Sequence, residues 1–243
     1  MTAPGVRVWY AEAARLSGGD PSAVARRLAW LLPSERARYE RFVHDADRML
    51  FLAGRVMARL LVGRLIGCDP LAWRWREGPH GRPEIDEPEV RAHFNLAHSA
   101  GLVACALSPD REVGVDVEDR QRRRVDRRFV VRYCAPDEVA DIAAQPDDRW
   151  HDRFLIYWTL KEAYLKARGL GVSVQLSSVS FSLEDASPRV SFLDKLSTCD
   201  TRWRFQLHHP TERHLMAVAV PAAGGPAPPI EFLPFDWALV PEL

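Results

Sequence analysis

The sequence predicts an α+β fold of two similar lobes, each with helices packed on a small, mostly antiparallel sheet. Apolar residues recur at helical spacing in some segments and alternate with polar residues in others. The order of helices followed by strands occurs twice, each time over about half of the chain. We therefore expect an N-terminal lobe at residues 1–110 and a C-terminal lobe at 111–243, in which 221–243 forms a tail.

The first half is expected to run from a strand through helices to further strands. Asp20 is a favourable helix N-cap, Pro21 suits the first helical position and Pro33 ends that helix. Between Leu50 and Leu61 the apolar spacing is helical, so this helix should line a core. The expected strands are 6–10, 73–76, 92–97 and 102–107, and the expected helices are 20–32, 34–43 and 45–66.

The second half repeats this order after one leading strand. Gly169 and Gly171 suit the end of its longest helix. Residues 221–229 are rich in Pro, Ala and Gly, and we expect them to wrap loosely. The expected strands are 113–118, 179–183, 189–192, 202–208 and 215–220, and the expected helices are 127–133, 136–144 and 150–167.

Charge and hydropathy exclude several classes of protein. Thirty-three basic residues balance thirty-three acidic ones, so no net field draws the molecule to nucleic acid or to an anionic membrane. The apolar segment 51–66 is interrupted by Arg55, Arg59 and Arg64, and the first residues lack the apolar core of a signal peptide. The four cysteines have no metal-binding spacing. We expect a cytoplasmic protein whose anion sites are local.

A pair of acids lies in the segment Gly114-Val115-Asp116-Val117-Glu118. In a strand, alternation places Asp116 and Glu118 on one face. Neighbouring carboxylates repel each other unless they are solvated or share a cation, and hard oxygen ligands suit Mg²⁺. A polar outer strand face is the alternative that this segment alone leaves open.

A second group of charges lies on the helix expected at 150–167. Glu162 and Lys166 are four residues apart and share a helix face. The chain has only three lysines, two of which are Lys161 and Lys166, which suggests a specific need for lysine here. An ammonium group can neutralise phosphate, and a carboxylate can complete a metal site or accept a proton. The pair suits phosphoryl transfer, although an exposed ion pair is the simpler alternative.

Candidate phosphate ligands lie mostly in the first half. The expected strand 92–97 runs into a turn at His98 and Ser99. A hydrolase is disfavoured, because adjacent residues rarely satisfy the geometry of a catalytic triad and no G-x-S-x-G motif occurs. Guanidinium groups bind phosphate well, but in a chain with thirty arginines each one alone is as readily a surface residue. The candidates are Arg36, Arg38, Arg55 and Arg82.

Taken together, these motifs resemble the 4′-phosphopantetheinyl transferase superfamily over about residues 30–220. The resemblance is carried by GRP at 81–83, FNLAHS at 94–99, GVDVE at 114–118 and WTLKEAYLKARGLG at 158–171. The larger, Sfp-like branch fits best, which implies a monomer of two pseudo-symmetric lobes. The family further implies a site between the lobes, where the diphosphate of coenzyme A binds Mg²⁺, or Mn²⁺ in its place.

The resemblance assigns roles by position. Asp116, Glu118 and Glu162 match the metal-binding acids, and Asp116, Glu162 and Lys166 are the expected catalytic residues. Lys166 also matches a lysine that contacts the phosphates, and Lys161 matches the lysine directly before the glutamate. His98 and Ser99 match the phosphate-binding strand end, where Ala97 replaces a frequent serine. The basic positions that hold the nucleotide and its 3′-phosphate are matched by Arg36, Arg38, Arg55 and Arg82.

The reaction that the resemblance implies is transfer of 4′-phosphopantetheine to a serine of an apo acyl or peptidyl carrier protein, with release of adenosine 3′,5′-bisphosphate. Such transfer activates fatty acid, polyketide, nonribosomal peptide or siderophore synthesis. We expect no nucleic-acid or membrane partner, and we hypothesise that the arginine-rich run at 120–128 docks the acidic carrier. Two alternatives are another Mg²⁺-dependent phosphoryl or nucleotidyl transferase, and a non-catalytic protein that binds coenzyme A or a carrier.

Overall fold

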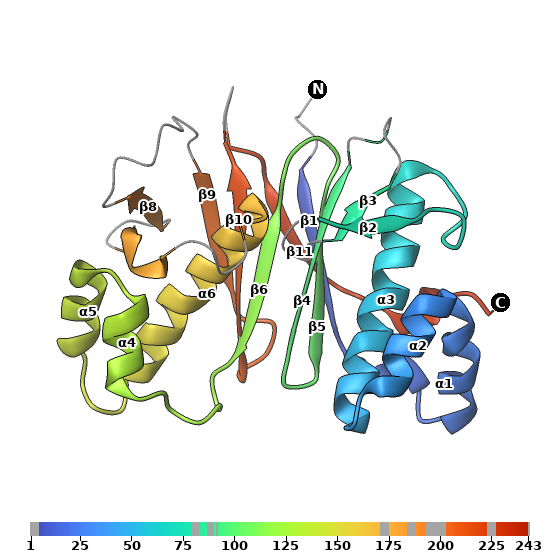
Figure 1. The fold of residues 1–243 in the computed structure, drawn as a ribbon, viewed down its shortest axis with the longest axis horizontal. Coiled ribbons are helices and arrows are strands. Elements are labelled where there is room, and N and C mark those ends of the chain that lie inside the picture. Colours follow the sequence, from blue (N-terminus) through green and yellow to red (C-terminus); the bar gives the residue numbers. More distant parts are fainter. Residues whose placement is uncertain are drawn as a thin grey trace.

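Two lobes lie side by side, each with a sheet on its inner side and helices on its outer side (Figure 1). The computed structural model describes residues 5–78, 83–86, 90, 92–170, 175–183, 188–192, 203–222 and 227–242. Among the strands of these residues, β1 and β11 form the one parallel pair, and every other pair is antiparallel. The predicted α+β fold is confirmed. No helix in the described part of the chain is long and apolar enough to cross a bilayer.

The first lobe is a four-stranded sheet, in the order β11-β1-β5-β4, whose outer face is covered by α3. The helix expected at 45–66 forms with those bounds, because its apolar stripe packs on the sheet. The helix expected at 20–32 is shorter and passes into a 3-10 turn. The elements before the tail are β1 (Val6–Glu12), η1 (Ala13–Ser17), α1 (Pro21–Arg27), η2 (Leu28–Trp30), α2 (Pro33–Arg41), α3 (Asp45–Ile66), β2 (Trp75–Glu77), β3 (Pro83–Ile85), β4 (His93–Ser99) and β5 (Leu102–Ser108).

The second lobe has a three-stranded sheet in the order β6-β10-β9, with α6 on its outer face. The long helix ends as predicted at Gly169, whose φ of 62° is left-handed, whereas Gly171 lies outside the described residues. The elements are β6 (Gly114–Asp119), α4 (Arg127–Tyr133), α5 (Pro136–Ala143), α6 (Trp150–Arg168), η4 (Leu176–Ser178), β7 (Val179–Ser182), β8 (Arg189–Phe192), β9 (Trp203–His208) and β10 (His214–Pro221).

The last described segment returns to the first lobe. β11 (Ile230–Pro234) adds to β1 as a parallel strand, and η5 (Trp237–Leu239) follows it. The indole nitrogen of Trp237 donates a hydrogen bond to the carbonyl oxygen of Glu12 at 3.0 Å. The sequence predicts this segment as a tail of the second lobe, whereas its strand belongs to the first-lobe sheet.

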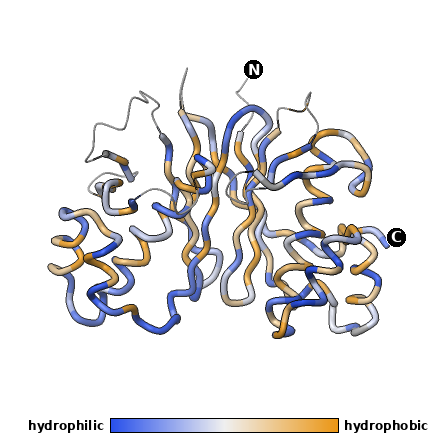
Figure 2. Tube along the Cα trace, in the orientation of Figure 1, coloured by the Kyte–Doolittle hydropathy of each residue, from blue (hydrophilic) through white to orange (hydrophobic). Residues whose placement is uncertain are grey.

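The inner faces of the two sheets pack on one another through small apolar side chains. We call this set the interlobe layer, and its buried members are Val6, Val8, Ala97, Leu102, Ala104, Ala106, Val113, Val115, Val117, Met216, Val218 and Val220. Each is at most 3% exposed. The hydrophobic strands at the centre of the molecule are visible in Figure 2. Because Val and Ala are short, the sheets approach closely and the lobes pack as one body.

Within the second lobe, β6 packs against α6 at a position where no side chain fits. A Cβ atom on Gly114 would overlap the carbonyl oxygen of Ala163 and the amide nitrogen of Ala167. Both are backbone atoms of a helix, so neither can move aside without distorting it. The glycine therefore lets the strand approach α6 closely, two residues before Asp116.

We expect Gly114→Ala to lower the free energy of unfolding by about 3 kcal/mol, because the added methyl group has no space. Gly54→Ala in α3 is the matched control, since its Cβ would lie 3.6 Å from the nearest side-chain atom, in ordinary contact. Alanine favours a helix over glycine by about 1 kcal/mol. Urea unfolding of both variants measures the difference, and equal stabilities would contradict the close approach.

Candidate functional site

The candidate site begins with four charged side chains on β6 and α6. Asp116 and Glu118 lie on one face of β6, and Glu162 and Lys166 lie one turn apart on α6. Lys166 Nζ donates to Asp116 Oδ1 at 2.6 Å, and the Asp116 side chain is only 9% exposed. Asp116 Oδ2 is buried and has no hydrogen-bond partner among the described residues. The strand and the helix thus bring the predicted motifs together.

The acids of this group affect one another. Burial raises the pKa of Glu162 above its ordinary value, and the charges of Asp116 and Glu118 raise it further, against the opposing effect of Lys166. Burial and Asp116 likewise raise the pKa of Glu118, although Arg122 and the Trp158 side chain donate hydrogen bonds to it. Negative charge is therefore concentrated here, and a bound cation would relieve the repulsion.

The donor chemistry suits Mg²⁺, because these are hard carboxylate oxygens, and one of them is buried without a partner in the described part of the chain. In the described residues, however, no three His, Cys, Asp or Glu side chains are arranged as a metal site. Two of the acids are instead bound to basic side chains, Asp116 to Lys166 and Glu118 to Arg122, whose Nη1 lies 2.8 Å from Glu118 Oε2. The expectation that three acids share one ion therefore stays a prediction.

A cavity of about 250 Å³ in the first lobe is lined by three of the predicted phosphate ligands. Arg38 comes from α2, Arg55 from α3 and His98 from β4. The floor is mainly apolar and aromatic. The other lining residues are Leu50, Phe51, Gly54, Trp75, Pro83, Leu96, Ala97 and Val103.

Arg55 is held firmly at this cavity. Its guanidinium carbon lies 4.8 Å from the ring centre of Phe51 and 4.5 Å from that of Trp75, and its side chain is only 13% exposed. Its Nε lies 3.6 Å from Oε1 of the buried Glu35, which also binds Arg59 at 2.9 Å. Aromatic contacts and a carboxylate thus fix the orientation of the guanidinium, which is favourable for binding phosphate.

His98 connects the cavity with the acids of the second lobe. Its ring keeps a solvent-exposed side. Partial desolvation lowers its pKa, and the positive charge of Lys166 lowers it further, while Asp47 and Asp116 oppose this. Because β4, which carries His98, lies beside β6, which carries Asp116 and Glu118, the cavity and the acid cluster form one candidate site between the lobes. A lowered pKa leaves the imidazole neutral near pH 7.

The structure does not bring every predicted residue to this site. Arg36 is on the surface, where its Nε lies 3.4 Å from Glu40. Ser99 is the last residue of β4 and, by alternation, lies on the opposite strand face from His98. Arg82 lies outside the described residues, although its neighbour Pro83 lines the cavity.

Lys161 requires a correction, because its side chain is only 1% exposed inside the second lobe. Its Nζ lies 2.6 Å from Glu138 and also donates to the carbonyl oxygens of Tyr133, Leu176 and Val179. Burial lowers the pKa of the Lys161 amine, and the negative charge of Glu138 opposes this shift. Burial raises the pKa of Glu138, and the positive charge of Lys161 opposes that shift. All donors of Lys161 are used within the protein, which argues against the expected contact with coenzyme A.

Sequence reasoning missed three residues that support the site. Glu35 orients Arg55, and Trp158 donates to Glu118. Asn95 is buried, and its side-chain oxygen accepts a hydrogen bond from the backbone N–H of Val115 at 2.9 Å. Asn95 and Trp158 belong to recognised motifs, and a buried amide inside an otherwise apolar strand was the available signal for Asn95.

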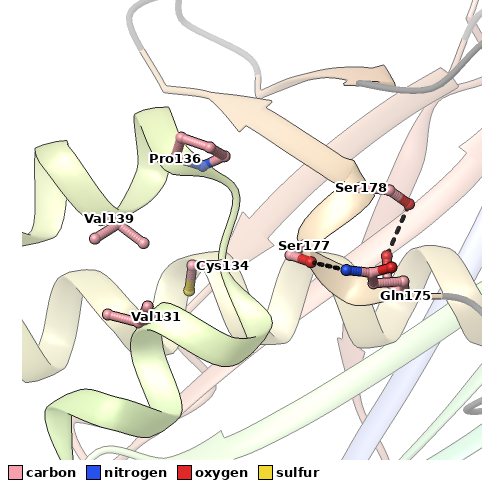
Figure 3. Close-up of a pocket in the computed structure, with 7 residues that line it drawn as sticks. All are labelled: Val131, Cys134, Pro136, Val139, Gln175, Ser177 and Ser178. Atoms are coloured by element: carbon pink, nitrogen blue, oxygen red, sulfur yellow. Dashed lines mark hydrogen bonds between the residues drawn. The ribbon is translucent and has the colours of Figure 1, made fainter.

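A larger cavity of about 570 Å³ lies on the outer side of the second lobe (Figure 3). Val131, Cys134, Pro136 and Val139 form its apolar side, facing the polar group of Gln175, Ser177 and Ser178. The polar groups bond to one another, since Gln175 Nε2 donates to Ser177 Oγ at 3.0 Å and Ser178 Oγ donates to the Gln175 carbonyl at 2.8 Å. Burial raises the pKa of Cys134 to about 12, so its thiol is unreactive.

We expect Glu162→Gln to raise the Tm of the metal-free protein by a few degrees at pH 8. The pKa of Glu162 is raised by folding, so its ionised form costs stability above the folded pKa. The gain from Gln should shrink as the pH falls and vanish below the ordinary value of 4.5. Thermal unfolding at several pH values in EDTA tests this, and a Tm at or below that of the unaltered protein at pH 8 would contradict the crowding of acids.

Comparison with known proteins identifies the family. A model described as "4′-phosphopantetheinyl transferase superfamily" matches residues 112–219, and one described as "4′-phosphopantetheinyl transferase, N-terminal" matches 20–110. A phosphopantetheinyl transferase from Thraustochytrium sp. is 32% identical, over 92% of this chain and 82% of its own length. The transferase HetI from Nostoc sp. is 31% identical, over 86% and 87%. Sfp from Bacillus subtilis is 30% identical, over 72% and 76%. The chain therefore belongs to the 4′-phosphopantetheinyl transferase superfamily.

Proposed function

We propose that this protein transfers the 4′-phosphopantetheine group of coenzyme A to a serine hydroxyl of an apo carrier protein. The observation that carries the proposal is that a basic cluster and an acidic cluster lie near each other between the lobes. One is the basic cavity of Arg38, Arg55 and His98, and the other is the group of acids with Lys166. A basic cavity with an aromatic floor suits a phosphorylated nucleotide, and crowded carboxylates suit a cation bound to its diphosphate.

The residues of the first lobe would bind the nucleotide end of coenzyme A. Arg55, held between two aromatic rings, would contact phosphate with little loss of side-chain entropy. The neutral His98 would donate a hydrogen bond to a diphosphate oxygen, and Arg38 and Arg82 would add positive charge. This arrangement would position the diphosphate beside Asp116 and Lys166.

Asp116, Glu118 and Glu162 would hold Mg²⁺, or Mn²⁺ in its place. When bound, the ion supplies charge neutralisation for the diphosphate oxygens. Lys166, released from Asp116, would bind a phosphate oxygen and offset the negative charge that develops there. The change in partner would cost little, because Lys166 exchanges one anionic oxygen for another.

The transfer forms one bond and breaks another. The serine oxygen of the carrier forms a bond to the β-phosphorus of coenzyme A, the diphosphate P–O bond breaks, and adenosine 3′,5′-bisphosphate leaves with the bonding electrons. Glu162, directly or through water, would take the serine proton, since its carboxylate lies on α6 one turn from the phosphate-binding Lys166.

The deciding experiment incubates the protein with coenzyme A, Mg²⁺ and a panel of apo acyl, peptidyl and aryl carrier proteins. We expect mass spectrometry to detect phosphopantetheine on at least one carrier, and Asp116→Ala or Glu162→Ala to lower the rate by at least about a thousandfold. EDTA should abolish transfer, and Mg²⁺ or Mn²⁺ should restore it. Carrier modification that is unaffected by both substitutions would sink the proposal.

The two lysines of α6 provide a matched internal control for that experiment. Lys166→Ala should lower kcat and lower Tm less than Lys161→Ala does, because the Lys166 side chain is 31% exposed whereas that of Lys161 is 1% exposed. Lys161→Ala should lower Tm sharply, since breaking a buried ion pair costs about 3–5 kcal/mol. The fraction of Lys161→Ala that stays folded should keep the affinity of the unaltered protein for coenzyme A.

We also propose that the arginine-rich run at 120–128 helps to dock the carrier. Arg120 and Arg127 are paired internally with Asp152 and Asp147, and Arg122 is bound to Glu118. Arg123 is exposed, and Arg124 is exposed although it donates to the carbonyl oxygen of Asp147. Exposed guanidinium groups beside the acid cluster suit an acidic partner surface.

Reversing Arg123 and Arg124 to Glu should raise KM for the carrier by about tenfold, with the affinity for coenzyme A nearly unchanged, because the substitutions repel the carrier alone. The effect should weaken at high salt. Arg15→Glu in the first lobe is the control, since this side chain is 74% exposed and lies outside the site. A carrier KM equal to that of the control would count against docking here.

A further inference from the structure

The two lobes meet at a seam formed by one strand from each. β4 is an edge strand of the first-lobe sheet, and β6 is an edge strand of the second-lobe sheet. The two lie side by side (Figure 1). In the described residues they belong to separate sheets, with no backbone ladder between them. Their register must therefore be fixed by side chains.

One buried hydrogen bond crosses this seam. Asn95 Oδ1 on β4 accepts from the backbone N–H of Val115 on β6 at 2.9 Å. Asn95 is 4% exposed and Val115 is fully buried, so no water competes for the bond. By alternation Asn95 shares its strand face with Ala97, a member of the interlobe layer, and therefore faces the second lobe. Without this acceptor, a buried N–H would lose its partner.

The bond joins the two halves of the candidate site. Val115 directly precedes Asp116, so the bond fixes the backbone from which that carboxylate projects. Asn95 lies three residues before His98 on the same strand. His98 on β4 and Asp116 on β6 thus lie on the two strands that meet at this seam.

A second hydrogen bond joins the C-terminal end of β4 to the second lobe. His214, at the start of β10, is 5% exposed, and its Nε2 lies 3.3 Å from the carbonyl oxygen of Ala100, directly after β4. A carbonyl can only accept, so Nε2 donates this hydrogen bond, and Nδ1 lies 2.8 Å from the Thr211 hydroxyl oxygen. β4 is thus bound to the second lobe near both of its ends, and His98 lies between the two bonds.

We propose that Asn95 is a positioning residue, which sets the register between the phosphate-binding first lobe and the acidic cluster of the second. The proposal rests on the phosphopantetheine transfer proposed above. Asn95 contacts neither the cavity nor the acids, so its loss should leave each half-site intact. What should change is their relative placement, and a displacement of about 1 Å can cost about a hundredfold in rate.

The test compares Asn95→Leu, which keeps a similar volume without the acceptor, with Val8→Ala. Val8 is fully buried in the same interlobe layer but lies on β1, two strands from β4. We expect Asn95→Leu to lower kcat about a hundredfold, with KM for coenzyme A within about threefold of the unaltered protein. Val8→Ala should lower Tm with kcat nearly unchanged. Equal kcat for the two variants, measured well below both Tm values, would overturn the proposal.

Asn95→Asp provides the rescue, because a carboxylate still accepts from the Val115 N–H. We expect its kcat to exceed that of Asn95→Leu by at least about fivefold. An Asp variant no faster than the Leu variant would contradict the role of Asn95 as a hydrogen-bond acceptor.

Amide hydrogen exchange supplies a readout that is independent of activity. Exchange at Val115 should accelerate in Asn95→Leu and not in Val8→Ala, whereas unchanged exchange would refute the anchoring. Failure of the proposed function itself would appear differently, as absence of transfer by the unaltered protein.

Discussion

The close approach of β6 to α6 at Gly114 is the contact on which the chemistry of the second lobe depends. Side chains normally separate the backbone of a strand from that of a helix packed on it. Removing the side chain at one strand position brings the two backbones together, so the short Asp116 side chain reaches Lys166 at 2.6 Å. Lobe packing then builds on that contact, since Val115 and Val117 point the other way into the interlobe layer. One strand therefore serves the site on one face and the core on the other.

The site itself is electrostatically unfavourable, and the surrounding structure compensates for it. Glu118 and Glu162 are both harder to ionise than ordinary carboxylates, because burial and neighbouring acids oppose their charge. Next to Glu162 on α6, Lys161 and Glu138 form a buried pair whose polar atoms bind several backbone groups. That pair attaches α6 to α5 and β7, so the helix that presents the crowded acids is firmly held. The face of α6 that carries Glu162 is thus electrostatically unfavourable, whereas the face that carries Lys161 has its polar atoms paired.

Helices and strands whose segments carry a long, uniform hydrophobic pattern could be predicted from the sequence. Elements whose conformation depends on pairing with a distant segment could not. The helix at 45–66 was predicted because apolar residues keep helical spacing between Leu50 and Leu61, over the middle of its twenty-two residues. β3 was missed because its segment is rich in Gly and Pro, and pairing with β2 decides its conformation. In the site, Lys161 was misassigned because one helix residue turns a side chain by about 100°, which directs it inward while Glu162 faces the seam. The amide of Asn95 stands out in an apolar strand, but its partner could not be predicted, since that partner is a backbone N–H twenty residues away.

The return of β11 to β1 affects the order in which the molecule can form. A parallel neighbour for β1 becomes available only when residues 230–234 have been synthesised, more than two hundred residues after the strand that they accompany. During translation the edge of β1 stays unprotected while the whole second lobe emerges, and such edges invite pairing with other chains. Long-range pairing of this kind also slows folding, because a large loop must close before any contact compensates for the lost entropy. Completion of the first lobe is therefore a late event in the biogenesis of this enzyme.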